Sequence, residues 1–237
     1  MTMTERSSHL ASRMDSLAGI VILAGGASKR MGTPKAKLTL PTGEFLLDYH
    51  LRHSLGLNVP IMIADNERGF GVHQDLISGK SQSPVSYISD YGATNSDGQV
   101  DTGGALVAIE SALQALINLN DSGIPENKQS SWLLVISCDS LIPASDLWQK
   151  LKSSIAQSAD KQVIFLTDDS HLYPLLGIYR VSIEPHLKAY IDSGQRRVIP
   201  FIQPIMQSLC FSDNWQDLTN FNTPEDFTRA CAALSDL

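Results

Sequence analysis

The chain has 237 residues, of which 43% are hydrophobic and 18% charged, and its formal net charge is -7. These values are typical of a folded protein with a full apolar core, and a single α/β domain often has about 200–250 residues. The acidic balance argues against a general nucleic-acid-binding protein, which usually has a basic face and a high pI. No apolar run of the sequence approaches the roughly 20 residues that span a bilayer, so neither nucleic acid nor a membrane is expected as a partner.

Three cysteines, Cys138, Cys210 and Cys231, occur without a CxxC spacing. This arrangement argues against a disulfide framework or a structural zinc site, and it predicts a reducing, cytoplasmic location. The N-terminal segment is polar and lacks the apolar stretch of a signal peptide. We therefore expect a flexible leader over residues 1–16 and a single domain over 17–237.

Apolar strand patterns alternate with helical patterns along the rest of the chain. Strands are predicted over 19–23, 59–65, 84–90, 132–139, 162–168 and 172–180, and helices over 44–56, 105–119, 145–158 and 182–193. The segment 91–104, rich in Gly, Asn, Asp and Thr, is predicted to be a loop. This alternation indicates βαβ units and a mostly parallel sheet in an α/β fold.

Several predicted strands end on glycine or polar residues. Ligands of open α/β sheets bind beyond the carboxyl ends of the strands, so these residues are expected to share a binding edge. They are Gly25 and Gly26, Asp65 and Asn66, Asp90, and Asp139.

The segment LAGGASKRMGTPK, residues 23–35, joins two glycines to a group of cations. Glycine lets backbone N–H groups approach a phosphate closely, and nearby cations neutralise its charge. The spacing matches neither GxGxxG nor GxxxxGK[ST]. We expect Arg30 and Lys35 to face a small anion such as a phosphate, with Lys29 and Lys37 at the rim; a tight turn with solvated lysines is the alternative.

Asp139 ends a strongly hydrophobic strand, where an unpaired carboxylate would be costly to bury. Next to a phosphate loop it is suited to hold Mg²⁺, and the alternative is a cap for the following helix. Asp90 could assist that ion or bind ribose, and Asp101 could equally be a helix cap. The histidines His50, His53 and His73 show no partner spacing and are predicted to lie at the surface.

The segment 23–35 resembles the LAGGxSxRMGxxK signature of the MobA-like nucleotidyltransferases. TGEFLLDY, SYISD and VISCDSLIP resemble further elements of that family. YPLLGIYRVSIEPHLKAYIDSGQRRVIPFI and FSDNWQDLTNFNTPEDF are similar to its molybdopterin guanylyltransferase branch, so the resemblance covers roughly residues 19–229. The chain departs from the family pattern at 103–108, at Tyr173 in place of a histidine, and at Ala64 in place of a polar residue.

The resemblance implies a three-layer Rossmann-like sandwich of nucleotidyltransferase type, with a nucleotide-binding part at about 17–145 and an acceptor-binding part at about 146–237. It implies Mg²⁺-dependent transfer of GMP from GTP to molybdopterin with release of pyrophosphate, and no covalent enzyme intermediate. Transient contact with molybdoenzymes or cofactor-insertion proteins is a further expectation. The implied catalytic residues are Arg30, Lys35 and Asp139, with Asp139 as the metal ligand. The implied nucleotide-binding residues are Leu23, Ala24, Gly25, Gly26, Lys35, Asn66, Asp90 and Asp139, and the implied acceptor-binding residues are Arg196, Arg197, Asn220 and Asn222.

Two alternatives remain open at this point. One is a related nucleotidyltransferase that uses CTP or a sugar-phosphate acceptor. The other is a catalytically weakened protein that binds GTP or a pterin without turnover. The RRV and NFNTPED elements favour the guanylyltransferase reading, whereas the altered residues at 103–108 and Tyr173 slightly favour the weakened binder.

Overall fold

We describe the protein from a computed structural model. It describes residues 16–26, 28, 30–78, 83–89, 91–94, 100–121, 131–158, 160–212 and 214–235, and for 91–94, 100–102 and 120–121 the backbone alone. The expectations for the leader at 1–15, for Lys29, for Asp90 and for the side chain of Asp101 lie outside these residues.

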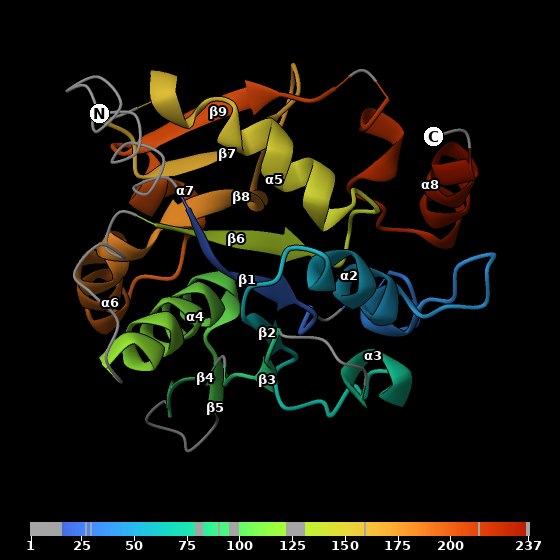
Figure 1. Cartoon of the computed structure of the whole chain (residues 1–237), viewed down its shortest axis with the longest axis horizontal. Coiled ribbons are helices and arrows are strands. Elements are labelled where there is room, and N and C mark those ends of the chain that lie inside the picture. Colours follow the sequence, from blue (N-terminus) through green and yellow to red (C-terminus); the bar gives the residue numbers. More distant parts are fainter. Residues whose placement is uncertain are drawn as a thin grey trace, which may run out of the picture.

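A seven-stranded sheet forms the centre of the molecule, with strand order β3-β2-β1-β6-β8-β7-β9 (Figure 1). Its strands are β1 (Leu17–Leu23), β2 (Ile61–Ala64), β3 (Val85–Tyr87), β6 (Trp132–Ser137), β7 (Val163–Thr167), β8 (Leu172–Arg180) and β9 (Met206–Cys210). Strand β8 runs antiparallel to both of its neighbours, and the other neighbouring pairs are parallel. The predicted mostly parallel sheet is therefore confirmed.

Helices cover both faces of this sheet. They are α2 (Leu46–Leu55), α3 (Gln74–Ser78), α4 (Gly104–Asp121), α5 (Ala144–Lys152), α6 (Glu184–Asp192), α7 (Val198–Ile202) and α8 (Pro224–Ser235), and short 3-10 turns lie at Lys35–Lys37, Ile155–Gln157, Val181–Ile183 and Gln216–Leu218. Helices α2, α5 and α8 contribute to one core cluster, and α4, α6 and α7 to the other. The expected three-layer α/β sandwich is confirmed.

The central strands have nearly continuous apolar sequences because both of their faces are buried. In β1, Ile20 and Ile22 face the α2 side, whereas Val21 faces the α4 side. All three side chains are fully buried. In β6, Leu134 and Val135 divide between the two sides in the same way. This burial fixes the carboxyl ends of β1 and β6 as neighbours at one edge of the sheet.

Three sequence expectations need correction. The segment 91–104 contains two short antiparallel strands, β4 (Tyr91–Thr94) and β5 (Val100–Thr102), rather than a loop alone. The helix expected over 145–158 ends at Lys152, because Ser153 and Ser154 donate their hydroxyls to the carbonyls of the preceding turn and compete with further helix. His50 is fully buried rather than at the surface, since α2 presents it to the core.

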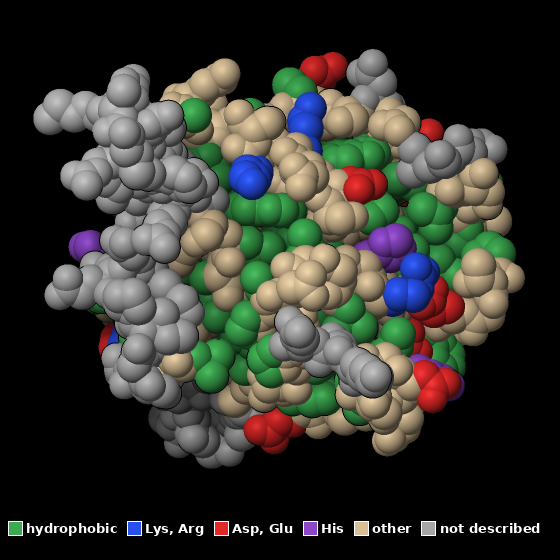
Figure 2. Space-filling view, viewed as in Figure 1, with side chains coloured by type: hydrophobic (Ala, Val, Ile, Leu, Met, Phe, Trp, Pro, Cys, Tyr) green, Lys and Arg blue, Asp and Glu red, His purple; other side chains and the backbone are tan. Residues whose placement is uncertain are grey.

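The outer face offers no broad basic surface in the view that shows α2, α4 and α5. Figure 2 shows the Lys and Arg side chains of the described residues standing apart on this face, with apolar and uncharged groups between them. Among the described helices, none is both long and apolar enough to cross a membrane.

Candidate functional site

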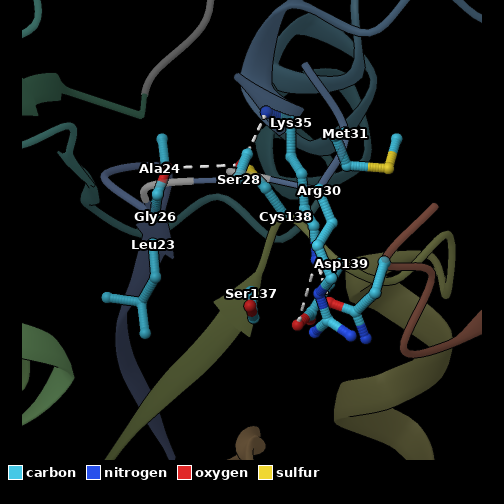
Figure 3. Close-up of a pocket in the computed structure, with 11 residues that line it drawn as sticks. Leu23, Ala24, Gly26, Ser28, Arg30, Met31, Lys35, Ser137, Cys138 and Asp139 are labelled. Atoms are coloured by element: carbon cyan, nitrogen blue, oxygen red, sulfur yellow. Dashed lines mark hydrogen bonds and ion pairs between the residues drawn. The ribbon is translucent and has the colours of Figure 1, made fainter. Parts of the chain in front are cut away.

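A pocket of about 200 Å³ lies at the carboxyl ends of β1 and β6 (Figure 3). The loop after β1 forms one side, the residues that follow β6 form the base, and the segment before α8 closes the other side. The lining residues are Leu23, Ala24, Gly26, Ser28, Arg30, Met31, Lys35, Ser137, Cys138, Asp139 and Asn222. The pocket thus brings together seven residues predicted from the sequence: Leu23, Ala24, Gly26, Arg30, Lys35, Asp139 and Asn222.

Lys35 connects the two ends of the chain within this pocket. Its Nζ donates a hydrogen bond to Asn222 Oδ1 at 3.1 Å and lies 3.7 Å from Asp139 Oδ2. Nζ also lies 5.6 Å from the centre of the Phe221 ring, a favourable cation–aromatic contact. The Lys35 side chain is only 14% exposed, so its charge is directed into the pocket rather than into bulk solvent.

The loop between β1 and Lys35 is shaped by Ser28. The Ser28 hydroxyl donates to the Gly26 carbonyl at 3.3 Å and accepts the Lys35 backbone N–H at 3.2 Å. Its φ of 44° is in the left-handed region. Figure 3 shows the side chains of Arg30 and Lys35 both extending toward Asp139, and Arg30 is exposed. The loop therefore presents two cations to whatever occupies the pocket.

The start of α8 holds Asn222 in place. Asn222 Nδ2 donates to the backbone carbonyl and to Oδ1 of Asn220, at 3.0 and 2.9 Å. Asp226 Oδ2 accepts the backbone N–H groups of Asn222 and Thr223, both at 3.1 Å, and Thr223 Oγ1 accepts the N–H of Asp226 at 3.2 Å. This reciprocal capping arrangement stabilises the first turn of α8. The hydrogen bond from the Asn222 backbone is the main cause of a lowered pKa of Asp226, so the cap carries a carboxylate.

Asp139 is the second residue after β6, and its side chain is 34% exposed. The residue at the N-cap of α5 is Pro143 and not Asp139, so the helix-cap alternative for Asp139 does not describe this structure. Neighbouring Cys138 is buried, and burial raises the pKa of its thiol to about 12. Cys138 is therefore a neutral thiol at physiological pH and not a nucleophile.

A second pocket of about 350 Å³ adjoins the first and shares Leu23, Gly26 and Ser137 with it. Its other lining residues are Gly25, Ala64, Asn66, Arg68, Gly104, Ala105, Ala108 and Leu175. Helix α4 contributes three of these residues, so this pocket is lined from the α4 side of the sheet, whereas the first is lined from the side of α8.

Asn66 is the predicted residue that fits this second pocket best. Its φ is 58°, and its buried Oδ1 has no hydrogen-bond partner among the described residues. Asp65, its neighbour, is buried and accepts the Phe70 N–H at 2.9 Å, which shapes the loop. An unsatisfied buried amide oxygen is costly unless a ligand supplies the donor, so Asn66 is suited to bind an N–H or O–H of a ligand.

Arg196 and Arg197 are not among the residues that line either pocket in the described part of the chain. Arg196 Nη1 donates to the carbonyls of Ile191 and Gln195, at 2.7 and 2.8 Å. Arg197 is the N-cap residue of α7. Figure 1 shows α6 and α7 near the beginning of β6, away from the arrowhead that leads to Asp139. Their predicted role in acceptor binding therefore stays a prediction.

The sequence reasoning missed Arg68 as a residue of the second pocket. Its Nη1 donates to the Gly26 carbonyl at 3.0 Å and so joins the loop after β2 to the loop after β1. Arg68 is the second residue after the strand-end pair Asp65 and Asn66. That position could have indicated it, since loops after neighbouring parallel strands meet at one edge.

Comparison with known proteins identifies the family of this chain. The family model of the MobA-like NTP transferase domain matches residues 20–205. A molybdenum cofactor guanylyltransferase from Vibrio atlanticus is 25% identical over 210 residues, which cover 88% of this chain and 93% of the relative. A probable molybdenum cofactor guanylyltransferase from Synechococcus elongatus is 28% identical over 218 residues, covering 87% and 94% of the two chains.

Among solved structures, molybdopterin-guanine dinucleotide biosynthesis protein A from Archaeoglobus fulgidus has the same fold. The TM-score is 0.64 at 18% sequence identity, and the match covers 92% of this chain and 100% of the other. The family match spans the glycine loop, Lys35, Asp139 and most of the sheet. The chain belongs to the family of MobA-like NTP transferases.

Proposed function

We propose that this protein transfers GMP from GTP to the phosphate of molybdopterin and releases pyrophosphate. The curated relatives that carry the name molybdenum cofactor guanylyltransferase support this reaction. The observation in the structure that carries it is the junction of Lys35, Asp139 and Asn222, which combines a phosphate-binding loop with the segment before α8. A nucleotide site alone would not require Asn222, whereas transfer to a second substrate requires donor and acceptor groups at one point.

In this proposal GTP occupies the second pocket and extends its triphosphate into the first. Asn66 binds the nucleoside, and the backbone from Leu23 to Gly26 lies along the phosphates. Lys35 and Arg30 stabilise the negative charge that increases on the triphosphate during transfer, because cations fixed at that position need no reorganisation. Asn220 and Asn222 bind the acceptor, whose phosphate oxygen attacks the α-phosphorus of GTP.

The site also fits a Mg²⁺ ion, which proteins often bind through one or two carboxylates together with substrate phosphates. The described residues contain no group of three or more His, Cys, Asp or Glu that could hold a metal. Asp139 is the carboxylate in the pocket, it is partly exposed, and Lys35 lies close enough to share a phosphate with it. Asp139 would hold the ion, which would neutralise phosphate charge when bound.

The test is a transfer assay with purified protein, GTP, Mg²⁺ and molybdopterin, in which dinucleotide and pyrophosphate are both quantified. We expect product with GTP at least about tenfold more efficiently than with CTP, ATP or UTP, because an unmet base contact costs roughly 1–3 kcal/mol. A preference for CTP would indicate a cytidylyltransferase. Tight nucleotide binding without pyrophosphate release would indicate the weakened binding protein.

Asp139→Asn tests the metal assignment within the same assay. The amide keeps the shape but removes the negative charge, so we expect activity to fall by about tenfold or more, with partial recovery at high Mg²⁺ concentration. Asp75→Asn is the matched control, since the Asp75 side chain is 89% exposed on α3. Full activity of the folded Asp139→Asn protein at low Mg²⁺ would remove Asp139 from the metal site.

A further inference from the structure

Strand β8 contains an irregularity next to the site. Phe165 of β7 pairs with Gly177, but the next residue, Leu166, pairs with Tyr173. The residues 174–176 are therefore extra on β8, and an odd insertion reverses which face of the sheet the following side chains occupy. Tyr173 accordingly packs against the core cluster on the α8 side, the side from which the first pocket is lined.

The bulge is held by the buried Tyr179, whose hydroxyl donates to the Pro174 carbonyl at 2.8 Å. Leu175, within the bulge, packs on the α4 side and lines the second pocket. The irregular segment thus lines the second pocket with Leu175 on the α4 face of the sheet and leaves Tyr173 on the α8 face. Bulges beside active sites commonly redirect a side chain in this way.

Tyr173 is clamped by Asp168. The phenol donates to Asp168 Oδ2 at 2.5 Å, and Asp168 Oδ1 accepts the backbone N–H groups of Ser170 and His171, at 2.7 and 2.6 Å. The Tyr173 hydrogen bond is the main cause that lowers the pKa of Asp168 to about 2. Burial, followed by the Asp168 hydrogen bond, raises the pKa of Tyr173 to about 12. At neutral pH the pair is therefore a carboxylate and a neutral phenol, which fixes the ring.

The clamped ring lies beside Asp139 and the segment before α8. Thr219 and Asp139 are both close enough to the Tyr173 phenol to influence its pKa. Thr219 also pairs through its backbone with Ser140, the residue after Asp139. The ring of Phe211 stands 4.8 Å from that of Tyr173 at an angle of 73°, and both rings are partly buried. Tyr173, with the Phe211 ring packed against it, thus lies close to Thr219, the residue before Asn220.

We infer that Tyr173, held by Asp168 and supported by Phe211, is the wall against which the acceptor's flat heterocycle packs while its phosphate lies at Lys35 and Asp139. This inference rests on the proposed function and deepens it, because it assigns the ring end of the acceptor to the edge formed by the carboxyl ends of β7 and β9 and the amino end of β8. Aromatic side chains bind flat heterocycles by stacking or edge contact. Tyr173 is then a specificity-determining residue for the acceptor, and its substitution should not change the affinity for GTP.

Steady-state kinetics of two variants distinguish the contribution of the Tyr173 ring from that of its hydrogen bond to Asp168. Tyr173→Ala removes the ring, and we expect the KM for molybdopterin to rise roughly tenfold while the KM for GTP stays within about twofold. Tyr173→Phe keeps the ring but loses the hydrogen bond to Asp168, so we expect a smaller rise, of about threefold. Tyr87→Phe is the matched control, because it removes one hydroxyl that likewise donates a single hydrogen bond, here to the Phe70 carbonyl at 2.6 Å.

Equilibrium binding of molybdopterin to the wild type and to Tyr173→Ala, followed by fluorescence, makes the result independent of turnover. If the wild type binds molybdopterin but transfers nothing, the proposed function fails. Weaker binding by Tyr173→Ala would in that case still support the contact between Tyr173 and the heterocycle. Equal binding by the wild type and a folded Tyr173→Ala protein overturns the inference, as does an equal rise of both KM values. A wild type that does not bind molybdopterin overturns both proposals.

Discussion

Lys35 and Lys37 stand two residues apart in one basic segment, yet the fold gives them different surroundings. Lys35 is directed into the first pocket by its contacts with Asn222 and Asp139. Lys37 is exposed, and its Nζ lies 5.3 Å from the centre of the Phe70 ring. The 3-10 turn at Lys35–Lys37 produces this separation, so the number of lysines alone does not show which of them faces the pocket.

Lys35→Ala should lower kcat/KM for transfer by about tenfold or more, which corresponds to about 1.4 kcal/mol of lost transition-state stabilisation. The reason is the loss of a fixed cation beside the triphosphate. Lys37→Ala, with the same chemical change, should retain nearly full activity. Both are measured at saturating Mg²⁺, with thermal unfolding as the folding control; equal kinetics for the two variants would contradict the assignment.

His50 makes the stability of the protein depend on pH. Its side chain is fully buried, and burial lowers the pKa of the imidazole from 6.5 to about 4. As the pH falls below 6.5, the unfolded chain takes up a proton at His50 that the folded protein does not. The free energy of unfolding therefore has its full value above that pH. It should fall by up to about 1.4 kcal/mol per pH unit as the pH decreases toward 4.

Denaturant unfolding of the wild type and of His50→Leu between pH 7 and pH 4 checks this expectation. The variant should show a shallower decline, since the group that titrates has been removed. His73→Leu is the control, because the His73 side chain is 67% exposed. Identical pH profiles for the wild type and His50→Leu would show that other groups cause the decline.

The resemblance in the sequence allowed Lys35, Asp139 and Asn222 to be predicted, because all three lie in motifs with fixed spacing. The face of the sheet on which the Tyr173 side chain lies could not be predicted in this way. It depends on the pairing register of β7 with β8, which is set by three-dimensional packing. Arg68 depends similarly on how two loops meet, and loop contacts leave little periodic signal in a sequence.

Strand β8 illustrates how one element depends on its neighbours. Gly177 lies between β6 and β7, paired with Val135 on one side and Phe165 on the other. A Cβ added at Gly177 would stand 2.7 Å from the Ile164 carbonyl oxygen and 2.7 Å from Phe165 Cβ. The small residue therefore allows the close approach of the two strands directly after the bulge at residues 174–176.

Gly177→Ala should lower the free energy of unfolding by about 1–3 kcal/mol, as overpacking in a well-packed core usually does. Urea unfolding measures the effect. Gly71→Ala is the matched control, because an added Cβ there meets nothing within 4 Å and the residue is exposed. If both variants were equally stable, the tight packing at Gly177 would be refuted.

At the level of elements, the sequence predicted best what is fully buried. The strands that became β1, β6 and β7 have continuous apolar runs, so their existence was clear from composition. Strand β9 lies at the edge of the sheet and contains Gln207 and Ser208 among its five residues. An edge strand needs no such run, and neither β9 nor the short pair β4 and β5 was predicted.

For the molecule as a whole, the division into a nucleotide part at 17–145 and an acceptor part at 146–237 stays a prediction. One sheet includes strands from both parts, from β1 through β9. The two pockets likewise combine them, since Leu23 and Ser137 line both, while Asn222 lines the first and Leu175 the second. Donor and acceptor would therefore meet on a shared strand edge rather than in a cleft between separate domains.

The two pockets adjoin at the ends of β1 and β6 but are lined from opposite faces of the sheet. A nucleotide seated on the α4 side would present its α-phosphorus to an oxygen that arrives from the α8 side. A single in-line displacement of this kind inverts the configuration of the α-phosphorus. A GTP analogue in which sulfur replaces one α-phosphate oxygen has a chiral α-phosphorus of known configuration. Its dinucleotide product should have the inverted configuration, which phosphorus NMR can measure. Retention would require two successive displacements, and with them a nucleotide bound covalently to a side chain.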